Sequence, residues 1–72
     1  MDRALDIAHL EQAERHVAQG KWHIARQREV VAVLRVGGFD TRLAVDLLHT
    51  FEQIQATHVA DRNRIQAELS KD

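Results

Sequence analysis

The stretch LRVGGFDTRL, residues 34–43, decides the fold, because it sets two adjacent glycines between two long segments rich in helix-forming residues. Gly37 and Gly38 follow the last apolar position of the first segment, where helices commonly end in the left-handed conformation that glycine adopts at little cost. Asp40 or Thr41 then offers a capping side chain for the next helix. So short a connection predicts an all-α, antiparallel two-helix hairpin, with helix 1 over about 3–36, the turn at 37–40 and helix 2 over about 41–70.

The first segment carries an apolar seam that repeats every seven residues. Its steps alternate between three and four, which is typical of a helix packed along a near-parallel or antiparallel partner. We therefore expect these positions to face helix 2. They are Leu10, Ala13, Val17, Gly20, Ile24, Gln27, Val31 and Leu34.

The second segment predicts a wider apolar face, whose spacings of four and seven repeat every eleven residues. Pairing Leu34 with Leu43 across the turn predicts that His58 lies opposite Gly20, so that the glycine makes room for an imidazole. The same register sets Gln27 near Phe51. The face comprises Leu43, Leu47, Ile54, His58, Ile65 and Leu69, widened near the turn by Ala44, Leu48 and Phe51.

Self-association is the expected source of additional stability. A single core in a chain of 72 residues supplies no more than about 3–5 kcal/mol, and the absence of cysteine excludes a disulfide. Two long helices alone leave wide apolar faces exposed to water, which a second copy would cover in a homodimeric four-helix bundle. The predicted core and dimer seam comprises Leu10, Val17, Ile24, Val31, Leu34, Leu47, Phe51, Ile54, His58 and Ile65.

Charge and hydropathy exclude several classes of partner. Ten basic and eleven acidic residues give a formal charge of -1, so there is no strong electrostatic attraction to nucleic acid or to an anionic membrane. No apolar run approaches the roughly 20 residues that span a bilayer, and the first residues lack the apolar core of a secretory signal. We therefore expect a cytoplasmic protein that makes no membrane contact.

One edge of helix 1 is a candidate contact surface. Between residues 15 and 35 there is a local excess of four positive charges, and the single tryptophan lies beside them, away from the predicted seam. An exposed tryptophan next to cations suits a protein partner or a nucleic acid. The alternatives are that the tryptophan is buried in the dimer and that the cations pair with acidic residues of helix 2. The candidate residues are Arg15, Lys21, Trp22, Arg26 and Arg28.

The five histidines are the least usual feature of the composition. His9, His16 and His23 recur every seven residues, about 10 Å apart along a helix, which is too far for one metal ion to bind two of them. We predict no metal site and no cofactor, with a metal-responsive bundle of several chains as the alternative. His58, on the core face, is a candidate for sensing pH.

No enzyme is predicted. Cysteine and tyrosine are absent, Ser70 is the only serine, and the glycine pair lacks the lysine of a phosphate-binding loop. The sequence therefore predicts a non-enzymatic module that binds itself and, through its outer faces, another protein. A nucleic-acid-binding hairpin dimer that uses the basic edge of helix 1 is the alternative.

Several short stretches carry a resemblance to known proteins. They are residues 15–18, residues 23–29, Asp40-Thr41, Leu47-Leu48 and Phe51-Glu52. Together they resemble small helical proteins of unassigned function from rhizobial and related alphaproteobacteria, over about residues 15–65 of this chain. The resemblance implies a helical hairpin in a bacterial, cytoplasmic setting and transfers no catalytic residue.

Overall fold

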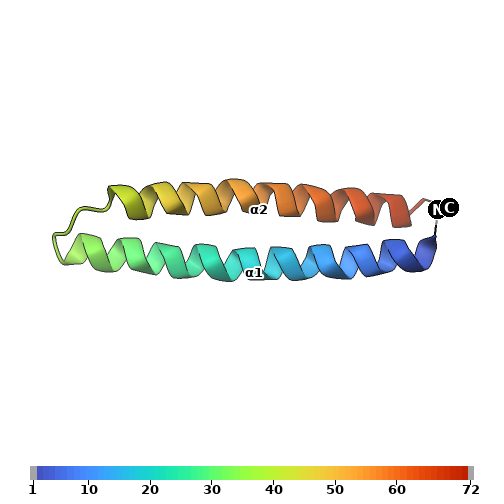
Figure 1. The fold of residues 1–72 in the computed structure, drawn as a ribbon, viewed down its shortest axis with the longest axis horizontal. Coiled ribbons are helices and arrows are strands. Elements are labelled where there is room, and N and C mark those ends of the chain that lie inside the picture. The colour runs from blue at the N-terminus through green and yellow to red at the C-terminus, as the bar shows by residue number, and fades with distance from the viewer. Residues whose placement is uncertain (1, 72) are drawn as a thin grey trace.

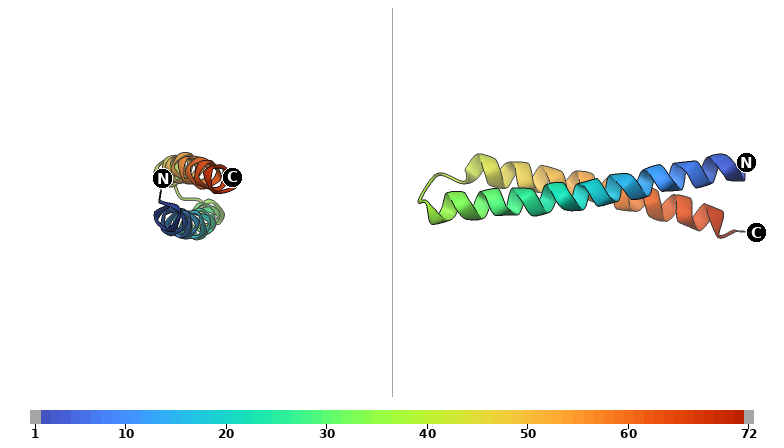
Figure 2. Two further views of the ribbon diagram at one scale, coloured as in Figure 1. Left: turned by 90° about the vertical axis from the view of Figure 1, so that its right-hand side faces the viewer. Right: turned by 90° about the horizontal axis from the view of Figure 1, so that it is seen from below.

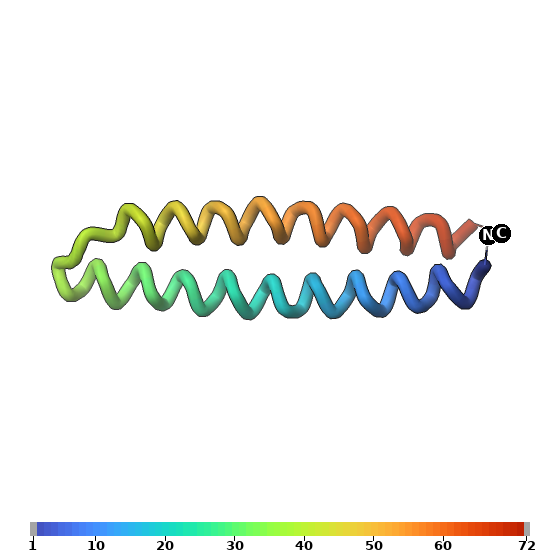
Figure 3. Tube along the Cα trace, viewed as in Figure 1, coloured from blue at the N-terminus to red at the C-terminus, as the bar shows by residue number. Residues whose placement is uncertain are grey.

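The computed structural model describes residues 2–71, which form two helices, α1 over Arg3–Val36 and α2 over Arg42–Leu69. The helices run antiparallel and side by side, so that the beginning of α1 and the end of α2 lie at the end remote from the turn (Figures 1 and 3). The molecule is a rod of 55 × 14 × 13 Å with a radius of gyration of 16.4 Å. A compact chain of this length has a radius of gyration of about 11 Å. The predicted all-α hairpin is confirmed.

Side chains outside the helices cap the beginning of each one. Oδ1 of Asp2 accepts hydrogen bonds from the backbone N–H of Ala4 at 2.9 Å and of Leu5 at 3.4 Å. Thr41, the residue before α2, makes no such bond with its side chain. Asp40 does so instead, since its Oδ1 accepts from the backbone N–H of Arg42 at 3.0 Å. Each helix thereby has a partner for at least one of its first free N–H groups.

The turn depends on Gly38, the one residue of the described chain with a positive φ, at 74°. This conformation lets the backbone N–H of Phe39 return to the carbonyl of Leu34 at 2.9 Å. The N–H of Gly37 likewise bonds to the carbonyl of Val33 at 3.1 Å. These bonds satisfy the last carbonyls of α1 and reverse the chain within a few residues.

Replacing Gly38 by alanine is expected to lower the free energy of unfolding by about 1–2 kcal/mol, because a Cβ disfavours positive φ. Space is not the reason, since a Cβ at this position would have no heavy atom within 4 Å. Gly38→Asn is the matched control and should cost less, because asparagine tolerates this conformation. Urea unfolding followed by circular dichroism measures both, and equal stability of the alanine variant and the wild type would contradict the argument.

The seam predicted along α1 is the face that meets α2. Ala13, Val17, Gln27 and Val31 are buried, and the other four predicted positions are partly buried. The helices cross at a shallow angle (Figure 2). Alternating steps of three and four keep the same strip of α1 turned toward its partner throughout.

The face of α2 agrees with the prediction in part, since all of its observed residues except Gln55 and Arg62 were predicted. The side chains against α1 are partly buried and are spaced by alternating steps of four and three: Ala44, Leu48, Phe51, Gln55, His58, Arg62, Ile65 and Leu69. The assignment of Leu47 and Ile54 to the contact between the two helices is wrong, since they are 43% and 47% exposed, and Leu43 is 85% exposed. A helix packed on a seven-residue seam must itself contact in a seven-residue repeat, and the predicted eleven-residue pattern drifts off that line.

Two glutamines set the register between the helices. Nε2 of Gln55 donates to the carbonyl of Val17 at 2.8 Å, and Nε2 of Gln27 donates to the carbonyl of Ala44 at 2.9 Å. The amide of Gln55 also occupies the space beside Gly20, where the Cδ atom would lie only 2.6 Å from an added Cβ.

The predicted pairs of Gly20 with His58 and of Gln27 with Phe51 are therefore wrong. Gly20 does make room for a side chain of α2, as expected, but that side chain is the amide one helical turn earlier. The Gln55 amide reaches the carbonyl of Val17 on the neighbouring helix, and this bond holds the amide beside Gly20.

The core between the helices is thin. Ala13, Val17 and Val31 are the only buried apolar side chains among residues 2–71, and none of them is fully buried. Each of the five ion pairs in this part of the chain joins exposed side chains, and such pairs contribute little, about 0–1 kcal/mol. A hairpin of this kind is marginally stable when it stands alone.

Candidate functional site

The two long sides of the hairpin differ in character. On one side, Arg28 of α1 pairs with Glu52 of α2 at 3.6 Å. The opposite side is hollowed by two grooves between the helices, and we call it the groove side. His16 lines both grooves, and His58 lies opposite it on α2. Multiples of seven residues from groove-lining positions continue the same side toward the turn. On α1 they lead from His16 and Gln19 to residues 30 and 33, and on α2 from Ile54 and Arg64 back to residues 47 and 43.

The half of the groove side near the turn is apolar. Five residues form what we call the apolar strip: Val30, Val33, Leu43, Leu47 and Ile54. The exposed fraction is 70% for Val33 and 85% for Leu43, and Val30 is partly buried. Val30 and Val33 also line a shallow pocket with Arg26 and Glu29. Exposed apolar side chains that are contiguous on one side typically mark a binding surface.

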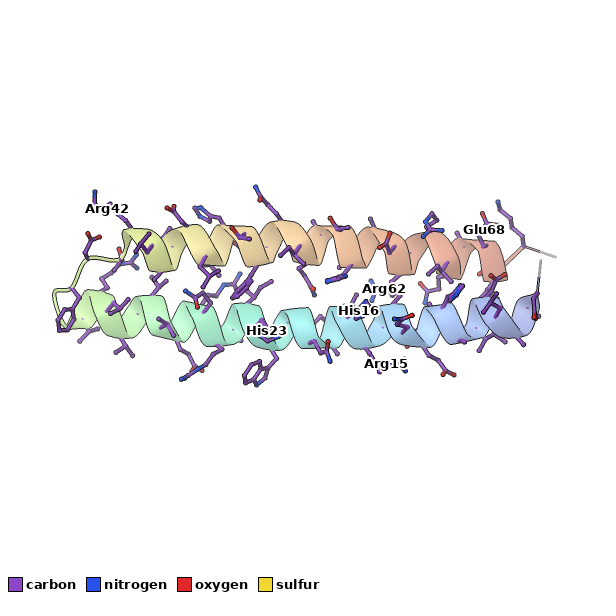
Figure 4. The ribbon with its side chains drawn as sticks, viewed as in Figure 1. Arg15, His16, His23, Arg42, Arg62 and Glu68 are labelled. Atoms are coloured by element: carbon purple, nitrogen blue, oxygen red, sulfur yellow. The ribbon has the colours of Figure 1, made fainter. Side chains whose placement is uncertain are left out.

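The half near the chain ends contains the histidine groove, a hollow of about 260 Å³. The ring centroids of His16 and His58 lie 5.0 Å apart across it, and both side chains are partly buried. Figure 4 shows His16 and Arg62 between the two helices. The groove is lined by His9, Gln12, Ala13, His16, His58, Asp61, Arg64 and Ile65.

The sequence did not indicate that His16 and His58 are neighbours, because the predicted register set His58 against Gly20. The correct register, one turn away, brings the two rings together from different helices. His23 lies farther toward the turn, with its ring centroid 5.8 Å from that of Phe51. Among residues 2–71, no three side chains of histidine, aspartate or glutamate converge on one point suited to a metal ion.

The basic edge of α1 is only partly available to a partner. Trp22 is 64% exposed and contacts the His23 ring edge-on, with centroids 5.2 Å apart. Arg26 pairs with Glu29 at 3.5 Å, and Arg28 is the residue paired with Glu52 across the helices.

Two other predicted cations of this edge, Arg15 and Lys21, are exposed and form no ion pair within the described chain. Arg15 lies on the outer side of α1 (Figure 4). The five residues therefore do not make one continuous basic surface, because acidic partners interrupt it.

An ion pair at the turn shifts the pKa values of both of its members. The side chain of Arg42 hydrogen-bonds to both carboxylate oxygens of Asp40, at 2.8 Å to Oδ2 and 3.2 Å to Oδ1. These bonds, and the one from the backbone N–H of Arg42, hold the pKa of Asp40 below its usual value and raise that of Arg42. Both groups are exposed, so the pair serves to order the start of α2 and offers no reactive group.

Comparisons with known proteins give no relative: no protein-family model, curated protein or solved structure matches this chain. Within residues 2–71, neither helix is long and apolar enough to cross a membrane. The class of protein is therefore defined by its fold alone, as an all-α helical hairpin with one side that carries exposed apolar residues.

Proposed function

We propose that the hairpin is a non-enzymatic interaction module that works as a homodimeric four-helix bundle, with the apolar strip as the surface on which a second copy packs. The single observation that carries this proposal is the exposure of Val33, Leu43, Leu47 and Ile54 on one side of a molecule whose own core is thin. The resemblance to rhizobial helical proteins sets the module in a bacterial cytoplasm, which stays a prediction.

The accessible area supports a partner of the same size. The chain exposes 5509 Å². A compact monomer of this mass exposes about 4,600 Å², so the hairpin exposes roughly 900 Å² more than its mass requires. Each partner in an interface of standard size buries about 800 Å². Covering the apolar strip with a second hairpin would thus remove the excess area.

The charges around the strip permit two copies to meet. No member of the strip is charged, and its nearest charged neighbours on α1, Arg26 and Glu29, already neutralise one another at 3.5 Å. Asp40 and Arg42 do the same at the turn. In a symmetric interface each group faces its own copy or a near neighbour, so a concentration of like charge would repel the second chain. The paired charges around the strip avoid such a concentration.

Replacing Leu47 by glutamate tests the proposal. The wild-type chain is expected to have twice the mass of the 8.3 kDa monomer in sedimentation or light-scattering measurements at micromolar concentration. Leu47→Glu should weaken dimerisation by about a hundredfold or more, because a symmetric interface contains the change twice. Its helix content should persist, since residue 47 is already 43% exposed in the single hairpin.

Ala56→Glu is the matched control, because residue 56 is exposed on the same helix and lies outside the strip. It introduces the same charge and should leave the dimer intact. A wild-type chain that remains monomeric at about 100 µM, with thermal unfolding independent of concentration, would contradict the proposal.

The basic edge of α1 gives weaker support to the alternative of nucleic-acid binding. Trp22 is exposed as that function requires, but Arg26 and Arg28 are held by acidic residues. Affinity for single-stranded RNA that falls steeply with added salt would favour this alternative.

A further inference from the structure

We propose that His16 and His58 form a site at which a divalent transition-metal ion, such as Zn²⁺ or Ni²⁺, bridges α1 and α2. The two rings come from different helices and lie next to each other at the histidine groove, with centroids 5.0 Å apart and planes tilted by 44°. Imidazole nitrogen is the ligand that Zn²⁺ and Ni²⁺ share, and partly buried rings on rigid helices hold their positions better than rings on loops.

The separation of the rings fits shared coordination. A Zn–N bond is about 2.0–2.1 Å, so two imidazoles bound tetrahedrally to one ion have centroids about 5 Å apart. The observed pair is at that separation before any ion binds. Neither ring has a hydrogen-bond partner among the side chains and backbone of residues 2–71 that binding would have to displace.

The remaining groups of the groove set the strength of the site. Asp61 lies one turn after His58 and lines the same groove together with Arg64. The two side chains pair at 3.7 Å, so their charges offset each other and the groove has no net negative charge to strengthen ion binding. The described chain supplies two histidines and no converging third ligand, so water completes the coordination. A site of this composition binds at micromolar or higher ion concentrations and is weaker than a structural zinc site with four protein ligands.

Binding at this site is coupled to folding. The two histidines are far apart in the sequence, and only the folded hairpin brings them together. An ion that bridges them binds the native state and not the unfolded chain, and so stabilises the hairpin in proportion to the logarithm of its concentration. The site concerns contacts within one chain and does not rest on the proposed dimer.

The test is thermal unfolding of the full chain, followed by circular dichroism, with and without zinc chloride. At 1 mM Zn²⁺ the midpoint is expected to rise by roughly 5–10 °C, and a chelator should reverse the rise. His16→Ala and His58→Ala should each lose the rise, since one remaining ring no longer bridges the helices. His49→Ala is the matched control and should keep the full rise, because His49 is exposed and lines neither groove.

Two further measurements keep the test decisive. Ring resonances of His16 and His58 in the wild-type protein should move together on adding Zn²⁺, while those of His49 stay in place, which needs no variant. The chain carrying Leu47→Glu should keep the same rise, which separates a site within one hairpin from metal that links two chains. The proposal would be overturned if Zn²⁺ did not raise the unfolding midpoint of the wild-type chain. It would also be overturned if His16→Ala and His58→Ala showed the same rise as the wild type.

Discussion

A chain carrying Val17→Asp is expected to be largely unfolded at 25 °C. Val17 is the most buried apolar side chain, at 4% exposure, and the Gln55 amide bonds to its carbonyl. Replacing it removes about 1.5–3 kcal/mol of apolar burial and sets a carboxylate between the helices, where its loss of hydration costs several kcal/mol more. The total exceeds the roughly 3–5 kcal/mol that a core of this size supplies. Far-ultraviolet circular dichroism measures the loss directly.

Ala18→Asp is the control for this change. It places the same carboxylate one residue along α1, at an exposed position, and so has the same effect on charge. Its cost in helix propensity is larger, at about 0.7 kcal/mol, because alanine is the best helix former whereas valine and aspartate have similar propensities. We expect it to lower the free energy of unfolding by less than about 1 kcal/mol. If the two variants melt within a few degrees of each other, the seam around Val17 does not hold the helices together.

Gly20→Leu is expected to lower the free energy of unfolding by about 2–3 kcal/mol, despite the better helix propensity of leucine. A side chain at residue 20 meets the amide of Gln55, so either the two helices separate or the amide leaves its bond to Val17. Urea unfolding of the variant gives the size of the effect.

The double variant Gly20→Leu, Gln55→Ala identifies the cause of this loss. Removing the amide vacates the space that leucine needs, so the double variant should be more stable than Gly20→Leu alone by at least about 1 kcal/mol. Oε1 of Gln55 is buried and accepts no hydrogen bond from the described residues. Removing this oxygen in Gln55→Ala therefore deprives no donor of its acceptor. Additive effects of the two changes would show that Gly20 and Gln55 do not interact.

The seam of α1 was predictable because the sequence offers one consistent pattern there. All eight predicted positions of the seam are buried or partly buried, including the polar Gln27 and the small Gly20. The 34 residues of α1 contain no proline, and a glycine pair follows them, so the sequence predicts one uninterrupted helix that ends at this pair. The turn followed from the same feature, since Gly38 adopts the positive φ for which glycine is suited.

The face of α2 was not predictable in the same way, because polar and apolar residues exchange their usual places there. Gln55 and Arg62 occupy positions that face α1, while the apolar Leu47 and Ile54 lie beside that face and remain exposed. Hydrophobicity alone therefore identified the apolar members of this face, but it added the exposed Leu43, Leu47 and Ile54 and missed the two polar members. The observed register lets the amides of Gln27 and Gln55 reach carbonyls of the other helix, which the spacing of apolar residues does not indicate.

The candidate sites, like the helices, were predictable from the sequence only in part. The exposure of Trp22 and the cations beside it could be anticipated from their place away from the seam. The contact between His16 and His58 could not, because it depends on a register that was wrong by about one turn. A repeat of three histidines drew attention to one helix, whereas the pair that the fold brings together uses one member of that repeat and a histidine from the other helix.

The position of the two chain ends has a consequence for how this rod can be attached to other bodies. The guanidinium of Arg3 donates to the carbonyl of Leu69 at 3.3 Å, so the ends of α1 and α2 lie next to each other. The turn lies at the opposite end of a molecule 55 Å long (Figure 1). A fusion partner joined to the first residues of α1 and the last residues of α2 would therefore hold the hairpin at that end, and the loop at Gly38 would project from it. The distance between two labels at the joined end would report separation of the helices. A label at the loop would report the orientation of the hairpin relative to the partner.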